Sequence, residues 1–397
     1  MARLNKNYTK VPEGYFTTQI IRKTKEFTDS HPGVEILKLG IGNTTEALVP
    51  VVIKGLRFGV EKLSRVKTYT GYGDEQGDMR LRQAVVDWYE KRKIVLSPLE
   101  ILISDGVKSD SANIGSIFSP DTIVAITDPV YPVYADSNII SGRKVVYLNA
   151  TKENNFIPDL PKGKVDLIYV CSPNNPTGVV MTRKQLKRFV DYAKEKKAII
   201  IFDAAYSEFI QDESLPKSIY EIKGAESCAI EMQSMSKSAG FTGVRLGWTV
   251  VPMGLVTEDS RSGIVNKYWN RRQTTMFNGA SNIVQEGGLA VLSEKGQRET
   301  RDQIKFYMKN AWIIKEGLKG LGLKIYGGEN APYIWVKCPK GLSSWEFFDK
   351  LLEEAHVVCT PGSAFGSQGE GYIRLSAFGH RENIKKAVES IKKNLKL

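Results

Sequence analysis

The stretch Cys228-Ala-Ile-Glu-Met-Gln-Ser-Met-Ser-Lys-Ser-Ala-Gly-Phe-Thr-Gly-Val-Arg-Leu-Gly-Trp248 joins a short apolar run to a polar turn that contains one lysine. The run at 228–233 is typical of the end of a strand. Lys237 then stands among small hydroxyl residues, and Arg245 follows among glycines, which let a backbone pass close to a bound group. A lysine amine forms a Schiff base with a carbonyl, while serine hydroxyls and an arginine bind phosphate oxygens. Taken alone, the stretch suits two interpretations equally: a lysine held against a phosphorylated aldehyde, or an ordinary surface lysine in a basic chain.

Short apolar runs alternate with helical patterns through the middle of the chain. The runs lie at 101–103, 122–126, 144–148, 165–170, 198–202 and 228–233. Strands of this kind are expected in sheets covered on both faces, so the sequence predicts an α/β fold with a mostly parallel sheet and crossover helices. One crossover helix is explicit, because Thr182 and Gln185 form a capping box ahead of an apolar stripe that starts at Leu186.

Polar residues follow these runs repeatedly, at the points where ligands bind in such sheets. In open α/β folds the ligand lies beyond the carboxyl ends of the strands. The polar segments in these places are Gly106-Val-Lys-Ser109, Asp128-Pro-Val-Tyr-Pro132, Pro173-Asn-Asn-Pro-Thr-Gly178, Asp203-Ala-Ala-Tyr206 and Ser234-Met-Ser-Lys237. We expect all five to meet at one site.

The pattern changes from about residue 290. A long helix is predicted at about 298–319, Ser343 and Glu346 form a second capping box, and a last helix carries the stripe Ile384, Ala387, Val388 and Ile391. Runs at 332–336 and 371–375 are of β type, and so is a short run at 37–40. The sequence predicts a large domain at 46–290 and a small α+β domain that combines 1–45 with 291–397.

Composition narrows the class of protein. The chain has 397 residues, 42% hydrophobic and 25% charged, as in soluble globular proteins, and a net charge of +12. The positive charge suits anionic ligands, but Lys and Arg are scattered and no basic arm or nucleic-acid signature is present, so nucleic acid is not expected as a partner.

The cysteines and the N-terminus indicate in which cellular compartment the protein is expected. The four cysteines lie far apart without a Cys-x-x-Cys pair, and there are only three histidines. Neither a zinc site nor a disulfide framework is indicated, which favours a reducing cytoplasm. The N-terminus lacks a signal-peptide core, and no apolar run is long enough to cross a membrane. We expect a cytoplasmic protein with no metal.

Three residues in the polar segments have chemistry of their own. Asp203 ends the most apolar run, where a carboxylate is costly unless it is paired, for instance with a protonated pyridine nitrogen; the alternative is a cap on the next turn. Tyr131 stands between two prolines and can stack on a flat ring or simply pack. Asn175 lies in a proline-bracketed turn and can contact a ring oxygen or serve as a turn residue.

Taken together, these segments resemble the fold type I, class I/II aminotransferases that depend on pyridoxal 5'-phosphate (PLP). The match runs over nearly the whole chain in the expected order. It implies that Lys237 carries the cofactor and moves the proton, while Asp203 pairs with the pyridine nitrogen. The other implied cofactor contacts are Tyr131 on the ring and Asn175 with Tyr206 at the 3-oxygen. At the phosphate the family implies Val107, Lys108, Ser234, Ser236 and Arg245 of the same chain. The partner subunit's Tyr72 would also contact the phosphate. The family also implies a homodimer with shared active sites and small amino-acid and oxo-acid substrates.

Within this group the chain is most similar to the LL-diaminopimelate aminotransferases. The similarity rests on 71–77, 128–134, 237–248 and 277–282. It implies transfer between L-glutamate/2-oxoglutarate and tetrahydrodipicolinate/LL-2,6-diaminopimelate in lysine biosynthesis. The implied substrate contacts are Tyr15, Gly42, Lys108 and Arg374, with Glu75 and Asn278 of the partner subunit. Arg374 would clamp the α-carboxylate, Glu75 would accept the distal ammonium, and Lys108 with Asn278 would bind the distal carboxylate.

Other interpretations stay open. Ser238 and the turn Gly73-Asp-Glu75 depart from the expected pattern near the pocket entrance, so aspartate, aromatic or other amino acids are alternative substrates. Ser234-Met-Ser-Lys237 also fits the Ser-x-x-Lys motif of penicillin-binding enzymes, but their Lys-Thr-Gly is missing. A PLP-binding sensor without activity would usually carry an added DNA-binding segment. We do not expect this class, because the family pattern begins by about Tyr15.

Overall fold

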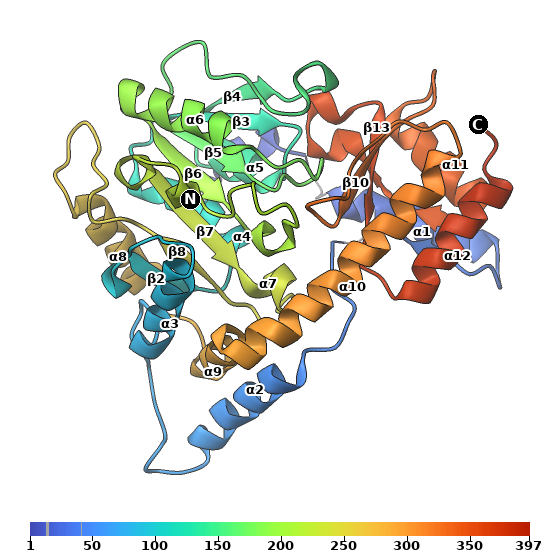
Figure 1. Ribbon diagram of the computed structural model, residues 1–397. Coiled ribbons are helices and arrows are strands. Elements are labelled where there is room, and N and C mark those ends of the chain that lie inside the picture. The colour runs from blue at the N-terminus through green and yellow to red at the C-terminus, as the bar shows by residue number, and fades with distance from the viewer. Residues whose placement is uncertain (13–15, 41) are drawn as a thin grey trace.

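The computed structural model describes residues 1–12, 16–40 and 42–397, without the side chain of Phe16. A seven-stranded sheet forms the centre of its larger part (Figure 1). In spatial order its strands are β2 (Ile101–Ser104), β8 (Gly247–Val250), β7 (Ala229–Ser234), β6 (Ile199–Asp203), β5 (Leu167–Cys171), β3 (Ile123–Asp128) and β4 (Lys144–Asn149). All strands share one direction except β8, which is antiparallel to both β7 and β2. The predicted α/β class and mostly parallel sheet are confirmed.

Helices follow most strands of this sheet. They are α4 (Val107–Asn113) after β2, α5 (Val133–Ile140) after β3, α6 (Arg183–Lys196) after β5 and α7 (Met235–Ser238) after β7. The predicted capping box is confirmed, because Thr182 Oγ1 accepts from Gln185 N at 3.3 Å and Gln185 Oε1 accepts from Thr182 N at 2.8 Å. Four further helices belong to this part of the chain. Before the first strand of the sheet come α2 (Pro50–Leu63) and α3 (Met79–Glu90), and after its last strand come α8 (Ile264–Met276) and α9 (Asn282–Leu292).

β8 was not expected from the sequence. Its four residues directly follow the glycine-rich turn and offer little alternation to recognise. The first residue of the strand, Gly247, must be glycine, because a Cβ there would lie 2.5 Å from the Gln233 carbonyl oxygen and 2.8 Å from Gly106 Cα. A single antiparallel strand thus closes the sheet between β7 and β2 and brings Gly106 beside Ser234.

The C-terminal part forms a second sheet with its own helices. Its strands are β12 (Thr360–Pro361), β13 (Tyr372–Ser376), β10 (Tyr333–Lys337) and β9 (Ile325–Gly327), all antiparallel. The helices are α10 (Glu294–Lys319), α11 (Ser344–Ala355) and α12 (Arg381–Asn394). The capping box of Ser343 and Glu346 is confirmed, while α10 begins four residues before the predicted start because Ser293 caps it.

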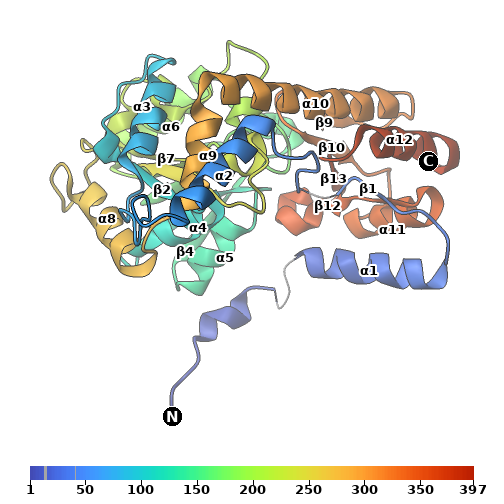
Figure 2. The ribbon, with the colours of Figure 1, turned by 90° about the horizontal axis from the view of Figure 1, so that it is seen from below.

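The N-terminal segment lies with this second sheet. β1 (Leu37–Lys38) pairs in parallel with β11 (Val357–Val358), and α1 (Phe16–Ser30) packs on α11 (Figure 2). The long helix α10 runs from α9 to α12 and so connects the two parts. The division into 46–290 and 1–45 with 291–397 stays a prediction, which the pairing of β1 with β11 supports.

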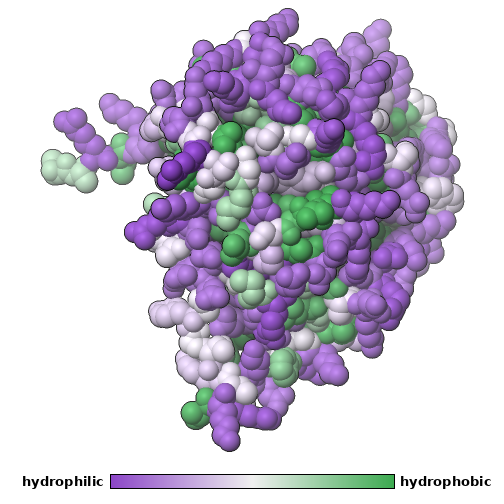
Figure 3. Space-filling view, turned by 60° about the vertical axis from the view of Figure 1, so that its left-hand side comes forward, coloured by the Kyte–Doolittle hydropathy of each residue, from purple (hydrophilic) through white to green (hydrophobic). Residues whose placement is uncertain are grey.

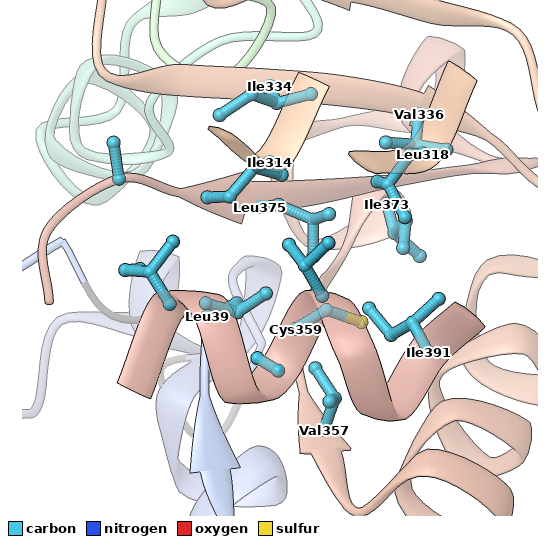
Figure 4. Packing of buried hydrophobic residues seen from close by; sticks show 14 of the residues in the cluster. Leu39, Ile314, Leu318, Ile334, Val336, Val357, Cys359, Ile373, Leu375 and Ile391 are labelled. Carbon is cyan, nitrogen blue, oxygen red and sulfur yellow. The ribbon is translucent and has the colours of Figure 1, made fainter. Parts of the chain in front are cut away.

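Aliphatic side chains from both segments fill the space under the second sheet. Leu39 of the N-terminal segment lies among residues of α10, β10, β13 and α12 in one buried cluster (Figure 4). The outer surface is largely hydrophilic on the face shown in Figure 3, with apolar groups gathered near its centre. No helix in the described ranges is long and apolar enough to cross a membrane.

The buried cluster predicts a test of stability. Phe347 is fully buried on α11, so Phe347→Ala should lower the free energy of unfolding by about 3–5 kcal/mol through lost burial and a cavity. Leu99→Ala, at a side chain that is 56% exposed, should change it by less than about 0.5 kcal/mol. Urea denaturation followed by circular dichroism measures both. Equal losses would contradict the cluster as described.

Candidate active site

A cavity of about 680 Å³ lies between the carboxyl edge of the seven-stranded sheet and the second sheet. The five polar segments that follow the predicted strands all contribute to its wall, as expected from the sequence. Among the residues that the sequence analysis singled out, the lining contains Gly42, Val107, Lys108, Tyr131, Asn175, Asp203, Tyr206, Ser234, Ser236, Lys237, Arg245 and Arg374. The structure therefore gathers most of the predicted site around one cavity.

The remaining predicted residues lie elsewhere. Tyr72 is 93% exposed, and Asn278 is exposed at a left-handed backbone position with φ of 65°. The loops of Glu75 and Asn278 pack together, because a Cβ on Gly279 would lie 3.3 Å from Glu75 Cα. None of these three residues lines the cavity of its own chain. Tyr15 lies outside the described residues.

Lys237 lies on the single helical turn α7, directly after β7. Its amine donates a hydrogen bond to the carbonyl oxygen of Gly42 and lies 5.6 Å from the ring centre of Phe378. Burial, followed by the nearby charges of Arg374 and Arg245, lowers the pKa of this amine to about 7. A lysine that is half neutral near pH 7 is a nucleophile and a proton acceptor.

Asp203 ends β6 with its side chain 6% exposed. Burial raises the pKa of its carboxyl to about 6, although the Tyr134 hydroxyl and Ala205 N (2.8 Å) both donate to it. The Ala205 contact shows that Asp203 also caps its own turn, which was the alternative interpretation. Both donors are neutral, so neither supplies the positive charge that best offsets the desolvation of the buried carboxylate. A protonated ring nitrogen would supply it.

Arg245 and two serines form a cradle for an anion. Arg245 Nη1 donates to Ser236 Oγ at 2.9 Å, and Ser236 N donates to Ser234 Oγ at 3.1 Å. A Cβ on Gly106 would lie 3.0 Å from Arg245 Nη2 and 3.5 Å from Ser234 Oγ. Glycine at 106, with φ of 119°, therefore keeps the cradle open. Two hydroxyls and a guanidinium are the donor set that binds phosphate.

Arg374 faces the cavity from β13 of the second sheet and is 4% exposed. It donates to Asn175 Oδ1 at 2.7 Å and to the Gly40 carbonyl at 2.9 Å. Its guanidinium lies 4.4 Å from the ring centre of Tyr333. These contacts hold the guanidinium in one orientation, and this planar group binds a carboxylate in two parallel hydrogen bonds.

Sequence reasoning missed two tyrosines of the site. Tyr134 donates to Asp203 and stacks on Tyr169, with ring centres 5.3 Å apart. Tyr333 exchanges a hydrogen bond of 2.7 Å with the hydroxyl of Tyr206. Tyr134 stands three residues after Tyr131, one helical turn away, which is a usable signal. Tyr333 gave none, because it stands in an apolar strand run.

The comparisons decide the family. The model of the class I and II aminotransferases matches residues 34–391. The chain belongs to the class I and II aminotransferases. A curated LL-diaminopimelate aminotransferase of Parabacteroides distasonis is 48% identical over the full length of both chains. This chain is also similar to the L,L-diaminopimelate aminotransferase structure of Chlamydomonas reinhardtii, at 44% identity, a TM-score of 0.93 and coverage of 99% and 98%.

More distant members of the family share the fold. The aspartate aminotransferase structure of Thermotoga maritima is 25% identical with a TM-score of 0.85, and the match covers 98% of this chain and 99% of that one. For this aminotransferase, no group of three or more His, Cys, Asp and Glu side chains in the described ranges is placed to hold a metal ion.

The lowered pKa of Lys237 makes a prediction about amine reactivity. Only the neutral amine reacts with acetic anhydride, and its fraction rises as pH rises through the pKa. In protein freed of small molecules, labelling of Lys237 should rise with a midpoint near pH 7, far below the ordinary lysine value of 10.5. Lys25, whose pKa is raised by its hydrogen bond to Asp29, is the control, and the midpoint of its labelling rate should lie above 10.5. Peptide mass spectrometry at several pH values measures both, and a shared midpoint would contradict the site electrostatics.

Proposed function

We propose that this aminotransferase uses PLP to transfer an amino group between L-glutamate/2-oxoglutarate and tetrahydrodipicolinate/LL-2,6-diaminopimelate. The observation that carries the proposal is the joint placement of Lys237, Asp203 and the Arg245 cradle around one cavity. An amine, a buried acid and an anion cradle are the three groups that match an aldehyde, a pyridine nitrogen and a phosphate.

The residues present fit PLP. Lys237 would hold its aldehyde carbon, Asp203 its ring nitrogen, and Arg245 with Ser234 and Ser236 its phosphate. Tyr131 would cover the ring, while Tyr206 and Asn175 would contact the 3-oxygen. When bound, the cofactor supplies an electron sink for the charge that develops at the substrate Cα. The buried carboxylate of Asp203 favours a protonated ring nitrogen, which strengthens that sink.

Lys237 moves the proton in this proposal. Its Nζ accepts a proton from the substrate Cα and later returns one. A pKa of about 7 suits this work, because the amine accepts and releases protons with similar ease near neutral pH. Burial, followed by the positive charges of Arg374 and Arg245, lowers the pKa of this amine and so keeps it from holding the proton too tightly.

Arg374 binds the α-carboxylate of each substrate. Its hydrogen bonds to Asn175 and Gly40 leave little rotational freedom, so a bound carboxylate is oriented as well as held. Both amino donors carry an α-carboxylate, and the same arginine therefore serves both half-reactions.

The distal end of diaminopimelate distinguishes it from glutamate, since it carries an ammonium as well as a carboxylate. We propose that Glu75 and Asn278 of the partner subunit contact this end in a homodimer. Lys108 and Gly42 of the chain that forms the cavity would contact it as well. The position of Glu75, Asn278 and Tyr72 outside their own cavity supports this arrangement. The curated relative with 48% identity supports the choice of substrate.

The cofactor assignment is tested at Lys237. Borohydride reduction of the purified enzyme followed by peptide mapping should place a pyridoxyl label on Lys237. Lys237→Ala should keep the circular dichroism spectrum and lose at least about 10³-fold in kcat, because both attachment and proton transfer depend on one amine. Lys305→Ala, at an exposed residue of α10, is the control and should keep full activity. Wild-type rates in Lys237→Ala would refute the assignment.

The substrate assignment is tested at Glu75. Loss of a charge-assisted contact costs about 1.5–3 kcal/mol, so Glu75→Ala should lower kcat/KM for LL-diaminopimelate by about 10–100-fold. The value for glutamate should change by less than about threefold, since glutamate has no distal ammonium. Asp74→Asn alters the neighbouring exposed carboxylate and should change neither value. Equal losses on both substrates would instead favour another amino acid as donor.

A further inference from the structure

Asp128 joins the two sheets and has no place in the function described so far. It ends β3 of the large sheet and is 3% exposed. Its Oδ2 accepts from Ser367 N at 3.1 Å and Ser367 Oγ at 2.8 Å, and its Oδ1 accepts from Gln368 N at 3.1 Å. Ser367 and Gln368 belong to the short turn η9 (Ser367–Gly369), which precedes β13 of the second sheet. One carboxylate thus receives three hydrogen bonds across the boundary between the sheets.

The opposite side of this contact is shaped to receive the carboxylate. Gly366 has φ of 128°, and a Cβ there would lie 2.1 Å from Asp128 Oδ1. Both the backbone conformation and the space require glycine. Next to it, Val130 N donates to the Phe365 carbonyl at 2.9 Å, which adds a backbone hydrogen bond across the same boundary.

Each end of this contact leads directly to a cavity residue. On the side of the large sheet, Tyr131 follows Asp128 by three positions and lines the cavity. On the side of the second sheet, the ring centre of Phe365 lies 4.9 Å from Cζ of Arg374. The hydrogen bonds of Asp128 therefore connect the residue proposed to cover the cofactor ring with the residue proposed to hold the substrate carboxylate.

We propose that Asp128 is a positioning residue that sets the location of Arg374 relative to the large sheet, and so the affinity for the substrate carboxylate. Its chemistry suits the task, because an ionised carboxylate offers only acceptors to three donors. An amide of the same shape offers one oxygen, and its NH₂ group would face N–H or O–H donors instead. The inference rests on the proposed function in one respect, the binding of a substrate carboxylate by Arg374.

Asp128→Asn tests the proposal against a matched control, Asp166→Asn, whose carboxylate contacts the other end of β3. There, Asp166 Oδ2 accepts from Ile123 N at 2.7 Å, far from the cavity edge. Glutarate, a dicarboxylate without an amino group, is titrated into each holoenzyme by calorimetry. Its Kd should rise about tenfold in Asp128→Asn, as expected for loss of charge-assisted hydrogen bonds, and less than about twofold in Asp166→Asn. PLP affinity should stay within about twofold in both variants.

Steady-state kinetics should likewise show a larger effect on substrate binding than on turnover. KM for 2-oxoglutarate should rise in Asp128→Asn by more than kcat falls. An unchanged glutarate Kd would overturn the proposal, and so would equal losses of glutarate and PLP affinity, which indicate general destabilisation. If Asp128→Asn does not fold, Ser367→Ala removes a single donor and should raise the Kd about two- to threefold; an unchanged value there also overturns it. A wild-type holoenzyme that binds no glutarate would refute the proposed function itself.

Discussion

The burial of one lysine amine is the constraint on which the site depends. A charged amine is costly to desolvate, and Lys237 lies where β7 ends beneath the second sheet, close to Arg374 and Arg245. The same burial raises the pKa of Asp203 to about 6. Burial in this site thus favours the neutral form of the Lys237 amine and also the neutral form of the Asp203 carboxyl. A ligand with a positive ring nitrogen and an electrophilic carbon would pair with Asp203 and react with the neutral amine of Lys237, and its phosphate would bind the Arg245 cradle. No single amino acid substrate offers all three groups.

The large sheet, and most of the cavity edge, could be predicted from the sequence because physical periodicity is local. Each apolar run that ends in a polar segment places that segment at the carboxyl edge of a parallel sheet, and Asp203 and Lys237 follow directly from this rule. Tyr333 could not be found in this way, since a tyrosine inside a strand pattern is indistinguishable from core until its hydroxyl partner is known. β8 was missed because its four residues directly follow a glycine-rich turn and offer little alternation to recognise.

Glu75 and Asn278 show a different limit of the sequence. The resemblance to a family named both residues, and the single chain holds their loops together but away from its own cavity. Spacing along the chain carries no information about a residue that serves another copy. A substrate that is charged at both ends needs contacts at its distal end, and in the proposed homodimer Glu75 and Asn278 of the partner subunit would provide them. In this proposal, cofactor chemistry and substrate choice come from different chains.

The site also divides between two sheets. The groups proposed to hold the cofactor belong to the large sheet, while Arg374 belongs to the second, so the distance between them is a property of the boundary and not of either sheet. Helix α10 spans this boundary on one side, where its buried side chains belong to the cluster that contains Leu39. In our proposal, Asp128 acts at this boundary three residues before Tyr131 of the cavity wall, through a carboxylate that the backbone of Gly366 is shaped to admit. Orienting two reacting groups across a boundary needs such a contact, because a shift of about 1 Å between them is enough to lower a rate about a hundredfold.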